Sequence, residues 1–105
     1  MKLRDLQIDP DRLAEICRRY HVVKLEAFGS FARDEAHEGS DLDILASFEA
    51  GGAPGLEFVA LAQELEALFS RRVDLFTRQS VEQAENKYFR RYALEDVQVL
   101  YERAA

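Results

Sequence analysis

Two short motifs in the first half of the chain carry residues suited to phosphate chemistry. Gly29-Ser30 is followed, after ten residues, by Asp41-Leu42-Asp43. Side chains two positions apart on a strand point to the same face, so Asp41 and Asp43 should project together. Two adjacent carboxylates are costly unless a cation neutralises them, and Mg²⁺, which takes oxygen ligands and also binds substrate phosphates, is the natural partner. The spacing therefore predicts a metal-dependent site for phosphoryl or nucleotidyl transfer.

The Gly-Ser pair is what separates this pattern from an ordinary surface Asp-x-Asp. Gly29 would end a strand and let backbone N–H groups approach a phosphate closely. A short helix expected over residues 31–36 would point its amino end at the same place, where the helix dipole favours an anion. Ser30 can donate its hydroxyl to a phosphate oxygen, cap that helix, or do both.

Two further residues flank the motifs and have alternative roles. Arg33 lies one helical turn past Ser30 and could reach a phosphate, or it could stay solvated beside its acidic neighbours. Ser40 could orient Asp41 or bind phosphate, although closing the turn before the strand would explain it equally well. We keep both as candidate nucleotide-binding residues.

A third carboxylate is expected from a later strand over residues 72–76. Val73 and Leu75 alternate with Asp74, so Asp74 should point away from their apolar face. A strand adjacent to Asp41 and Asp43 needs this arrangement to complete a three-carboxylate metal site. Such a site can hold two metal ions roughly 3.5–4 Å apart, which clamp the attacking and leaving oxygens.

The elements that must position these residues follow from apolar periodicity and turn signals. Asp9-Pro10 has the form of a helix start, with a capping carboxylate before a proline. Alternating residues 97, 99 and 101 favour an edge strand at the tail, although residues 94–105 also suit a helix. The expected elements are a helix over 9–20, strands over 22–28, 41–48 and 72–76, a helix over 56–70, and one amphipathic helix spanning Val81 to Tyr92. This order predicts an α/β (α+β) fold in which helices pack on a small mixed sheet of three to four strands.

Composition limits the class of protein. The 105 residues fit one domain over 1–105, and a net charge of −6 argues against a general nucleic-acid binder, which holds phosphates with Lys and Arg. Cys17 is the single cysteine and lies on an apolar helix stripe, so a buried, inert thiol is expected. The absence of a leader or a long apolar run predicts a cytoplasmic protein without membrane association.

The motifs together carry a resemblance to a known family. Residues 28–33 (Phe-Gly-Ser-Phe-Ala-Arg) and 39–44 (Gly-Ser-Asp-Leu-Asp-Ile), with the later Asp74, resemble the signature of the nucleotidyltransferase superfamily that includes DNA polymerase beta. The similarity is closest to its smallest branch, the minimal nucleotidyltransferases (MNT), which are antitoxins encoded beside HEPN-domain ribonuclease toxins. The segment 73–75 and the closing segment 97–101 lie where that family has comparable segments, so the resemblance covers nearly the whole chain.

The resemblance implies a role for each candidate residue. Asp41, Asp43 and Asp74 would be the catalytic carboxylates and bind Mg²⁺, with two ions expected. Asp74 would also help to deprotonate the acceptor hydroxyl. Gly29 and Ser30 would hold the triphosphate of ATP, the substrate.

The same resemblance implies a function and a partner. The chain would transfer AMP from ATP to a tyrosine of a cognate HEPN toxin and so neutralise it. Superfamily members that modify antibiotics, tRNA or DNA generally carry a further substrate domain, for which 105 residues leave no room. Two alternatives stay open, namely a non-catalytic antitoxin that acts by binding and occlusion, and a dimeric antibiotic-type nucleotidyltransferase for small molecules.

Overall fold

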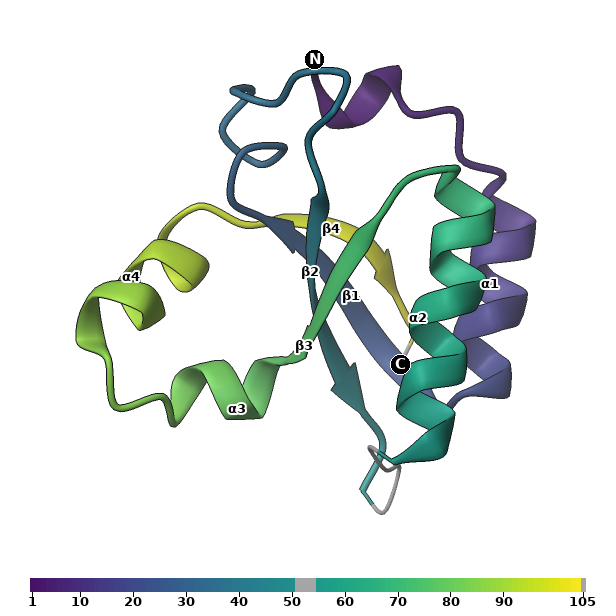
Figure 1. Cartoon of the computed structure of the whole chain (residues 1–105). Coiled ribbons are helices and arrows are strands. Elements are labelled where there is room, and N and C mark those ends of the chain that lie inside the picture. Colours follow the sequence, from purple (N-terminus) through teal and green to yellow (C-terminus); the bar gives the residue numbers. More distant parts are fainter. Residues whose placement is uncertain (51–54, 105) are drawn as a thin grey trace.

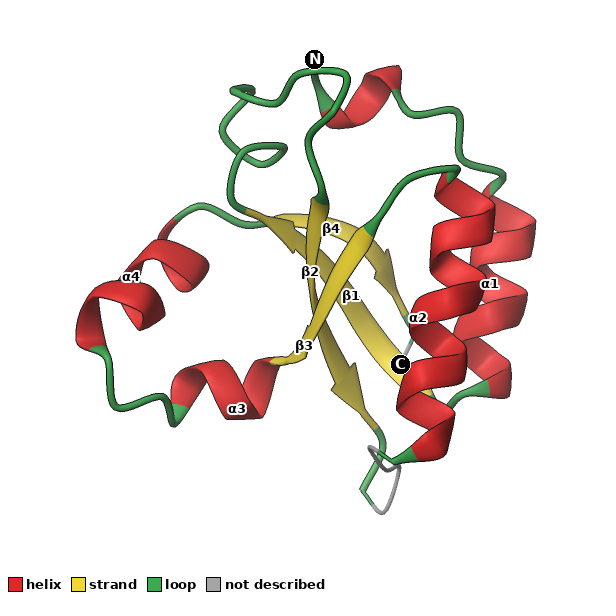
Figure 2. Ribbon diagram, in the orientation of Figure 1, coloured by secondary structure: helices red, strands yellow, loops and turns green. Residues whose placement is uncertain are grey.

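A four-stranded mixed sheet forms the centre of the computed structural model, which describes residues 1–50 and 55–104 (Figures 1 and 2). The strands are β1 (Val22–Phe28), β2 (Leu42–Phe48), β3 (Val73–Thr77) and β4 (Gln98–Glu102), in the spatial order β3-β2-β1-β4. The β2–β3 pair is parallel, whereas β1 pairs antiparallel with both β2 and β4. The expected mixed sheet is confirmed, and the tail forms the edge strand β4.

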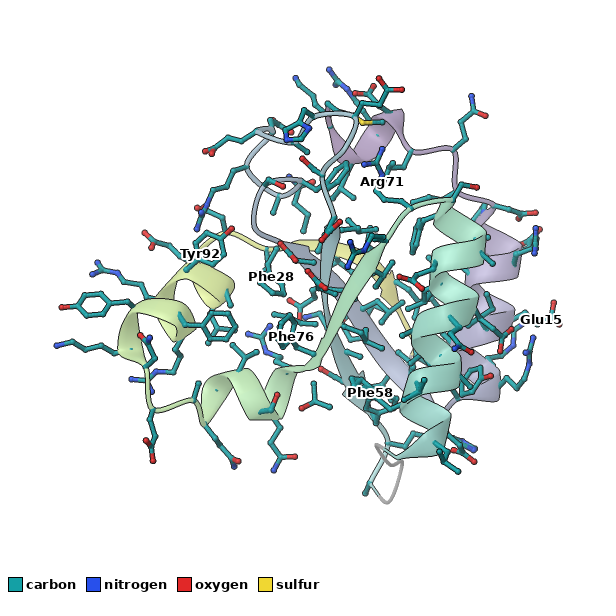
Figure 3. All side chains as sticks on the ribbon, in the orientation of Figure 1. Glu15, Phe28, Phe58, Arg71, Phe76 and Tyr92 are labelled. Carbon is teal, nitrogen blue, oxygen red and sulfur yellow. The ribbon has the colours of Figure 1, made fainter. Side chains whose placement is uncertain are left out.

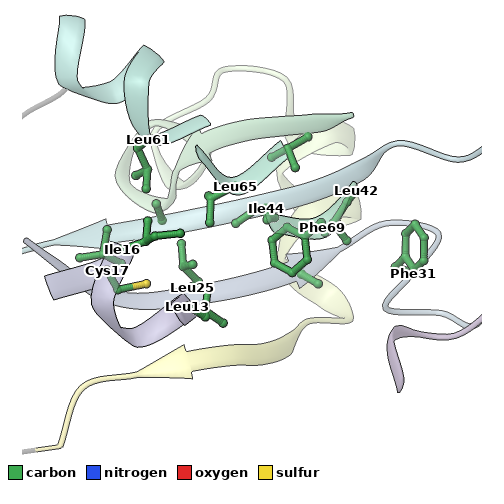
Figure 4. Close-up of a cluster of buried hydrophobic side chains, with 14 of the residues drawn as sticks. Leu13, Ile16, Cys17, Leu25, Phe31, Leu42, Ile44, Leu61, Leu65 and Phe69 are labelled. Carbon is green, nitrogen blue, oxygen red and sulfur yellow. The ribbon is translucent and has the colours of Figure 1, made fainter. Parts of the chain in front are cut away.

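Helices α1 (Pro10–Arg19) and α2 (Leu56–Phe69) pack together against one face of the sheet (Figure 1). The Asp9 side chain accepts hydrogen bonds from the N–H groups of Asp11 and Arg12, and Pro10 occupies the first turn, as the sequence predicts. The main apolar core lies between these helices and the sheet, and Figure 4 shows part of it. Leu42 and Ile44 of β2 point into this core, so the residue between them must face the opposite side of the sheet.

A smaller apolar cluster lies on that opposite face, under α3 (Arg78–Glu82) and α4 (Lys87–Glu95). It contains Phe28, Leu45, Val81 and Ala93. These two helices replace the single helix that the periodicity predicts over 81–92. The prediction was wrong because the Asn86 side chain accepts hydrogen bonds from the N–H groups of Tyr88 and Phe89 and so begins a new helix.

The short helix expected over 31–36 does not form either. Residues 29–34 make a turn in which the N–H of Arg33 donates to the carbonyl of Gly29 and that of Glu35 to the carbonyl of Ser30. Asp34 has a φ of 60°, in the left-handed region, and this conformation prevents the turn from continuing as an α-helix. The turn therefore offers no helix dipole to an anion. Its backbone N–H groups and the Ser30 hydroxyl are left as groups of the turn that could bind one.

The structure bears on the environment of Cys17 and on the length and apolar character of the helices. Cys17 is fully buried, and this burial raises the pKa of its thiol to about 12, so the thiol is inert as expected. Among the helices of the described residues, none combines the length and the apolar character needed to cross a membrane.

Candidate active site

The three predicted carboxylates come together where β2 and β3 run parallel. The register places Asp43 opposite Asp74, with Leu42 opposite Val73 immediately before them. Asp41 directly precedes β2. Because Leu42 and Val73 belong to the main core, Asp43 and Asp74 lie on the other face of the sheet, the face that α3 and α4 partly cover.

Asp43 lies at the centre of a concentration of negative charge. Burial, the largest effect, raises the pKa of the Asp43 carboxyl to about 6, and the neighbouring carboxylates of Asp74 and Asp41 raise it further in the same direction. Asp43 is half-buried, whereas Asp74 is exposed to solvent. The ionised form of Asp43 therefore needs a cation for compensation, and the exposed Asp74 leaves the site accessible from outside.

Gly29 brings the other half of the motif directly against these carboxylates. Its φ of 71° is left-handed, and a Cβ atom at this position would lie 2.5 Å from Asp43 Oδ2 and 3.0 Å from the Tyr92 hydroxyl oxygen. The antiparallel pairing of Phe28 with Asp43 produces this close approach. Glycine is thus required here by its backbone conformation and by the carboxylate that packs on it.

The donor chemistry of the site fits a hard divalent cation. All three carboxylates offer oxygen ligands, and the charges of Asp74 and Asp41 add to burial in raising the pKa of Asp43. With the side chains as they stand, no group of three or more His, Cys, Asp or Glu side chains in residues 1–50 and 55–104 has the spacing of a metal site. The side chains of Asp41, Asp43 and Asp74 would therefore have to move to hold a cation together.

Comparison with known proteins agrees with this geometry. The nucleotidyltransferase domain family matches residues 10–100, which include both motifs and Asp74. The chain belongs to the nucleotidyltransferase family. Over 68 residues it is 44% identical to the protein adenylyltransferase MntA of Thermococcus cleftensis, covering 64% of this chain and 67% of that protein.

Solved structures support the same fold for this nucleotidyltransferase. One, provisionally described as a minimal nucleotidyltransferase, is 33% identical with a TM-score of 0.69 and covers 93% of this chain and 95% of its own. A toxin–antitoxin structure with AMP-PNP has a TM-score of 0.68 at 19% identity, and the match covers 91% of this chain and 75% of that chain. The first likeness confirms the minimal nucleotidyltransferase fold, and the second is one of fold alone.

The two candidate nucleotide-binding residues that flank the motifs have other contacts in this nucleotidyltransferase. The Ser40 hydroxyl accepts a hydrogen bond from the N–H of His37 at 2.9 Å, which closes the turn before β2. Arg33 donates through Nε to Asp96 at 3.2 Å and through Nη2 to the Tyr92 carbonyl at 3.0 Å. Arg33 therefore points toward α4 and the segment after it, and its predicted contact with a phosphate stays a prediction.

Arg71 is a functional candidate that the motifs do not contain. Its Nη1 donates to the carbonyls of Glu38 and Ser40 at 2.8 and 2.6 Å, and its guanidinium lies 5.0 Å from the centre of the Phe31 ring. It thus ties the turn before Asp41 to the beginning of β3. A pocket of about 330 Å³ opens beside Asp41 and is lined by Glu38, Gly39, Ser40, Asp41, Ser70, Arg71 and Arg72.

Tyr92 is the second residue at the site, and its sequence spacing favours the core of a helix over contact with a nucleotide. The helical periodicity predicts it as one of the apolar positions of a helix, but 41% of the side chain is exposed. Its ring contacts Phe28 edge-on, with centroids 6.4 Å apart (Figure 3). The Arg33 guanidinium lies 4.4 Å from the centre of the same ring. Only the three-dimensional packing of α4 against the turn reveals this position.

Proposed function

We propose that this nucleotidyltransferase is an antitoxin that transfers AMP from ATP to a tyrosine hydroxyl of a cognate HEPN ribonuclease toxin. The observation that carries the proposal is the meeting of Asp43 and Asp74 on parallel strands, directly beside the Gly29-Ser30 turn. The similarity to a protein adenylyltransferase from Thermococcus cleftensis supports AMP as the transferred group. The fold shared with a toxin–antitoxin structure containing AMP-PNP supports both a triphosphate and a toxin partner.

Each group of the site has a distinct task in this transfer. The Gly29-Ser30 turn would hold the triphosphate through backbone N–H groups and the Ser30 hydroxyl. Asp41, Asp43 and Asp74 would hold Mg²⁺, in one or two ions, which neutralises developing charge on the phosphates and lowers the pKa of the acceptor hydroxyl. Asp74, being exposed, would receive the proton of that hydroxyl as the hydroxyl oxygen bonds the α-phosphorus of ATP and pyrophosphate leaves.

The exposure of the site suits a protein acceptor. Asp74 is exposed to solvent, so a tyrosine on another chain could approach. The resemblance of residues 28–44 to the MNT antitoxins supports a HEPN toxin as that chain. An attached AMP group would add bulk and negative charge beside a ribonuclease site, which would repel RNA.

The test is intact mass measurement after mixing the purified chain with the HEPN-like product of a neighbouring gene, ATP and Mg²⁺. We expect the toxin to gain mass in whole AMP steps with the wild-type chain. The double variant Asp41→Asn/Asp43→Asn should give no gain. Asp34→Asn/Glu35→Gln is a matched control that removes two exposed acids from the neighbouring turn, and it should keep the activity.

The same experiment separates the proposal from inhibition by occlusion. A tight complex in which the toxin is inhibited without any mass gain would show a binding antitoxin. Mass gain on a small-molecule acceptor, with no effect on any toxin, would support an antibiotic-type enzyme. Equal activity of wild type and the Asp41→Asn/Asp43→Asn variant would refute the assigned carboxylates.

A further inference from the structure

The Tyr92 hydroxyl lies at the phosphate turn, although Tyr92 is outside the motifs. It lies 3.0 Å from the point where a Cβ of residue 29 would be, and Asp43 Oδ2 lies 2.5 Å from the same point. Because both atoms lie close to this one point, the Tyr92 hydroxyl oxygen and Asp43 Oδ2 must also lie close to each other. A phosphate held by the Gly29-Ser30 turn and a cation on Asp43 would be adjacent to the phenol.

Phe28 and Arg33 both contact the Tyr92 ring and hold it in this position. Phe28 contacts it edge-on at an interplanar angle of 84°, and the Arg33 guanidinium covers its face. Arg33 also binds the Tyr92 backbone carbonyl and the Asp96 carboxylate, so it joins the phosphate turn to α4 and the segment after it. A residue held in this way presents its hydroxyl with little loss of side-chain entropy on binding.

The hydroxyl itself is free to bond a ligand. Within residues 1–50 and 55–104, no side chain or backbone group forms a hydrogen bond with the Tyr92 hydroxyl. The ionised carboxylate of Asp43 is an acceptor only, whereas a triphosphate requires donors. Arg33, the cation nearest to the turn in sequence, is already engaged by Asp96, so Tyr92 supplies the donor that Arg33 does not.

We infer that Tyr92 is a substrate-binding residue whose phenolic O–H donates a hydrogen bond to the triphosphate held at Gly29-Ser30, while Arg33 positions it. The inference rests on the proposed function, because it takes a nucleoside triphosphate as the ligand. It assigns α4 a role in binding the substrate, in addition to covering the smaller apolar cluster.

The test is the binding of ATP and of inorganic tripolyphosphate, each with Mg²⁺, measured by calorimetry on the full chain. Tyr92→Phe keeps the ring and its contacts with Phe28 and Arg33, and it should weaken both ligands by about tenfold, as expected for a hydrogen bond to a charged group. Tyr88→Phe is the matched control, since Tyr88 lies one turn earlier on α4 and is 73% exposed. It should bind both ligands as the wild type does.

The possible results are distinct. Equal affinities of Tyr92→Phe and wild type for both ligands would overturn the inference and leave the proposed function intact. Failure of the wild-type chain to bind ATP would remove the proposed function and the inference with it. A loss for ATP but not for tripolyphosphate would place the hydroxyl away from the phosphates and would also overturn the inference. The melting temperature of the unliganded Tyr92→Phe variant should match that of wild type. If it does not, both ligands are titrated at a temperature at which wild type and Tyr92→Phe are both folded, and the same comparison of affinities decides.

Discussion

Replacing Asp43 with asparagine should stabilise the metal-free protein at neutral pH. The pKa of Asp43 is raised from 3.8 to about 6, so the folded state holds this proton more tightly than the unfolded state does. The stabilising contribution of the protonated carboxyl is fully present below about pH 4 and is lost as the pH rises through about 6. Asparagine has nearly the same shape and carries no charge, so it avoids this loss.

The magnitude follows from the size of the shift. At 1.36 kcal/mol per pKa unit the full shift corresponds to about 3 kcal/mol, which is an upper bound. Asp43 is half-buried and Asp74 is exposed, so solvent screens their repulsion, and about 1–2 kcal/mol is the expected gain. The difference in unfolding free energy between Asp43→Asn and wild type should grow from near zero at about pH 4 to this value at pH 7.

Urea unfolding in the presence of a chelator, at several pH values between 4 and 8, measures this difference. Asp34→Asn is the control, because it removes an exposed charge from the same region without touching Asp43, and its effect should not follow the same pH dependence. Addition of Mg²⁺ should stabilise wild type by preferential binding to the folded state and should stabilise Asp43→Asn much less. A pH-independent difference, or an Asp43→Asn variant less stable than wild type at pH 7 without metal, would refute the electrostatic reasoning.

Three further substitutions test the packing at Gly29 and a buried ion pair of the sheet. Gly29→Ala should lower the free energy of unfolding, measured with urea, by about 1–2 kcal/mol through its left-handed φ alone. The added Cβ should also displace the Asp43 carboxylate, so calorimetry should show weaker binding of Mg²⁺. Arg78→Met should cost about 2–3 kcal/mol, because Glu26 is only 2% exposed and Arg78 Nη1 binds its carboxylate at 2.6 Å. Glu82→Gln removes the exposed partner of the same arginine and should cost less than about 0.5 kcal/mol. An equal loss of unfolding free energy in Arg78→Met and Glu82→Gln would show that the burial of Glu26 does not determine the cost of breaking its ion pair.

The strands of the sheet could be predicted from the sequence because apolar residues occupy the positions that the fold buries. The edge strand β4 followed from the alternation of residues 97, 99 and 101, and β3 from Val73 and Leu75 on either side of an acid. The errors occurred where a single polar side chain overrides periodicity. Asn86 begins a new helix by accepting two N–H groups, and the left-handed Asp34 ends a turn that the local sequence would allow to become a helix.

The carboxylates could be found for a similar reason, whereas Tyr92 and Arg71 could not. A strand places residues two positions apart on one face, so the relation of Asp41 to Asp43 is local. The position of Tyr92 depends on how α4 packs against a turn about sixty residues earlier, through the hydrogen bond from Arg33 to its carbonyl. The contact of Arg71 with the Glu38 and Ser40 carbonyls likewise joins segments more than thirty residues apart. No periodicity in the sequence reports such contacts.

The structure also explains why glycine and the second aspartate of the motif belong together. Phe28 pairs with Asp43 across the β1–β2 ladder, so the residue after Phe28 must lie beside the Asp43 carboxylate whatever the length of the connection between the strands. At that residue a Cβ would lie 2.5 Å from Asp43 Oδ2. The register therefore creates the need for glycine, and the ten residues between Ser30 and Asp41 matter only in so far as they preserve that register. Gly29 then leaves the carboxylate close to the backbone that would hold a phosphate, which is how one antiparallel pair of strands brings a metal ligand and a phosphate turn into a single site.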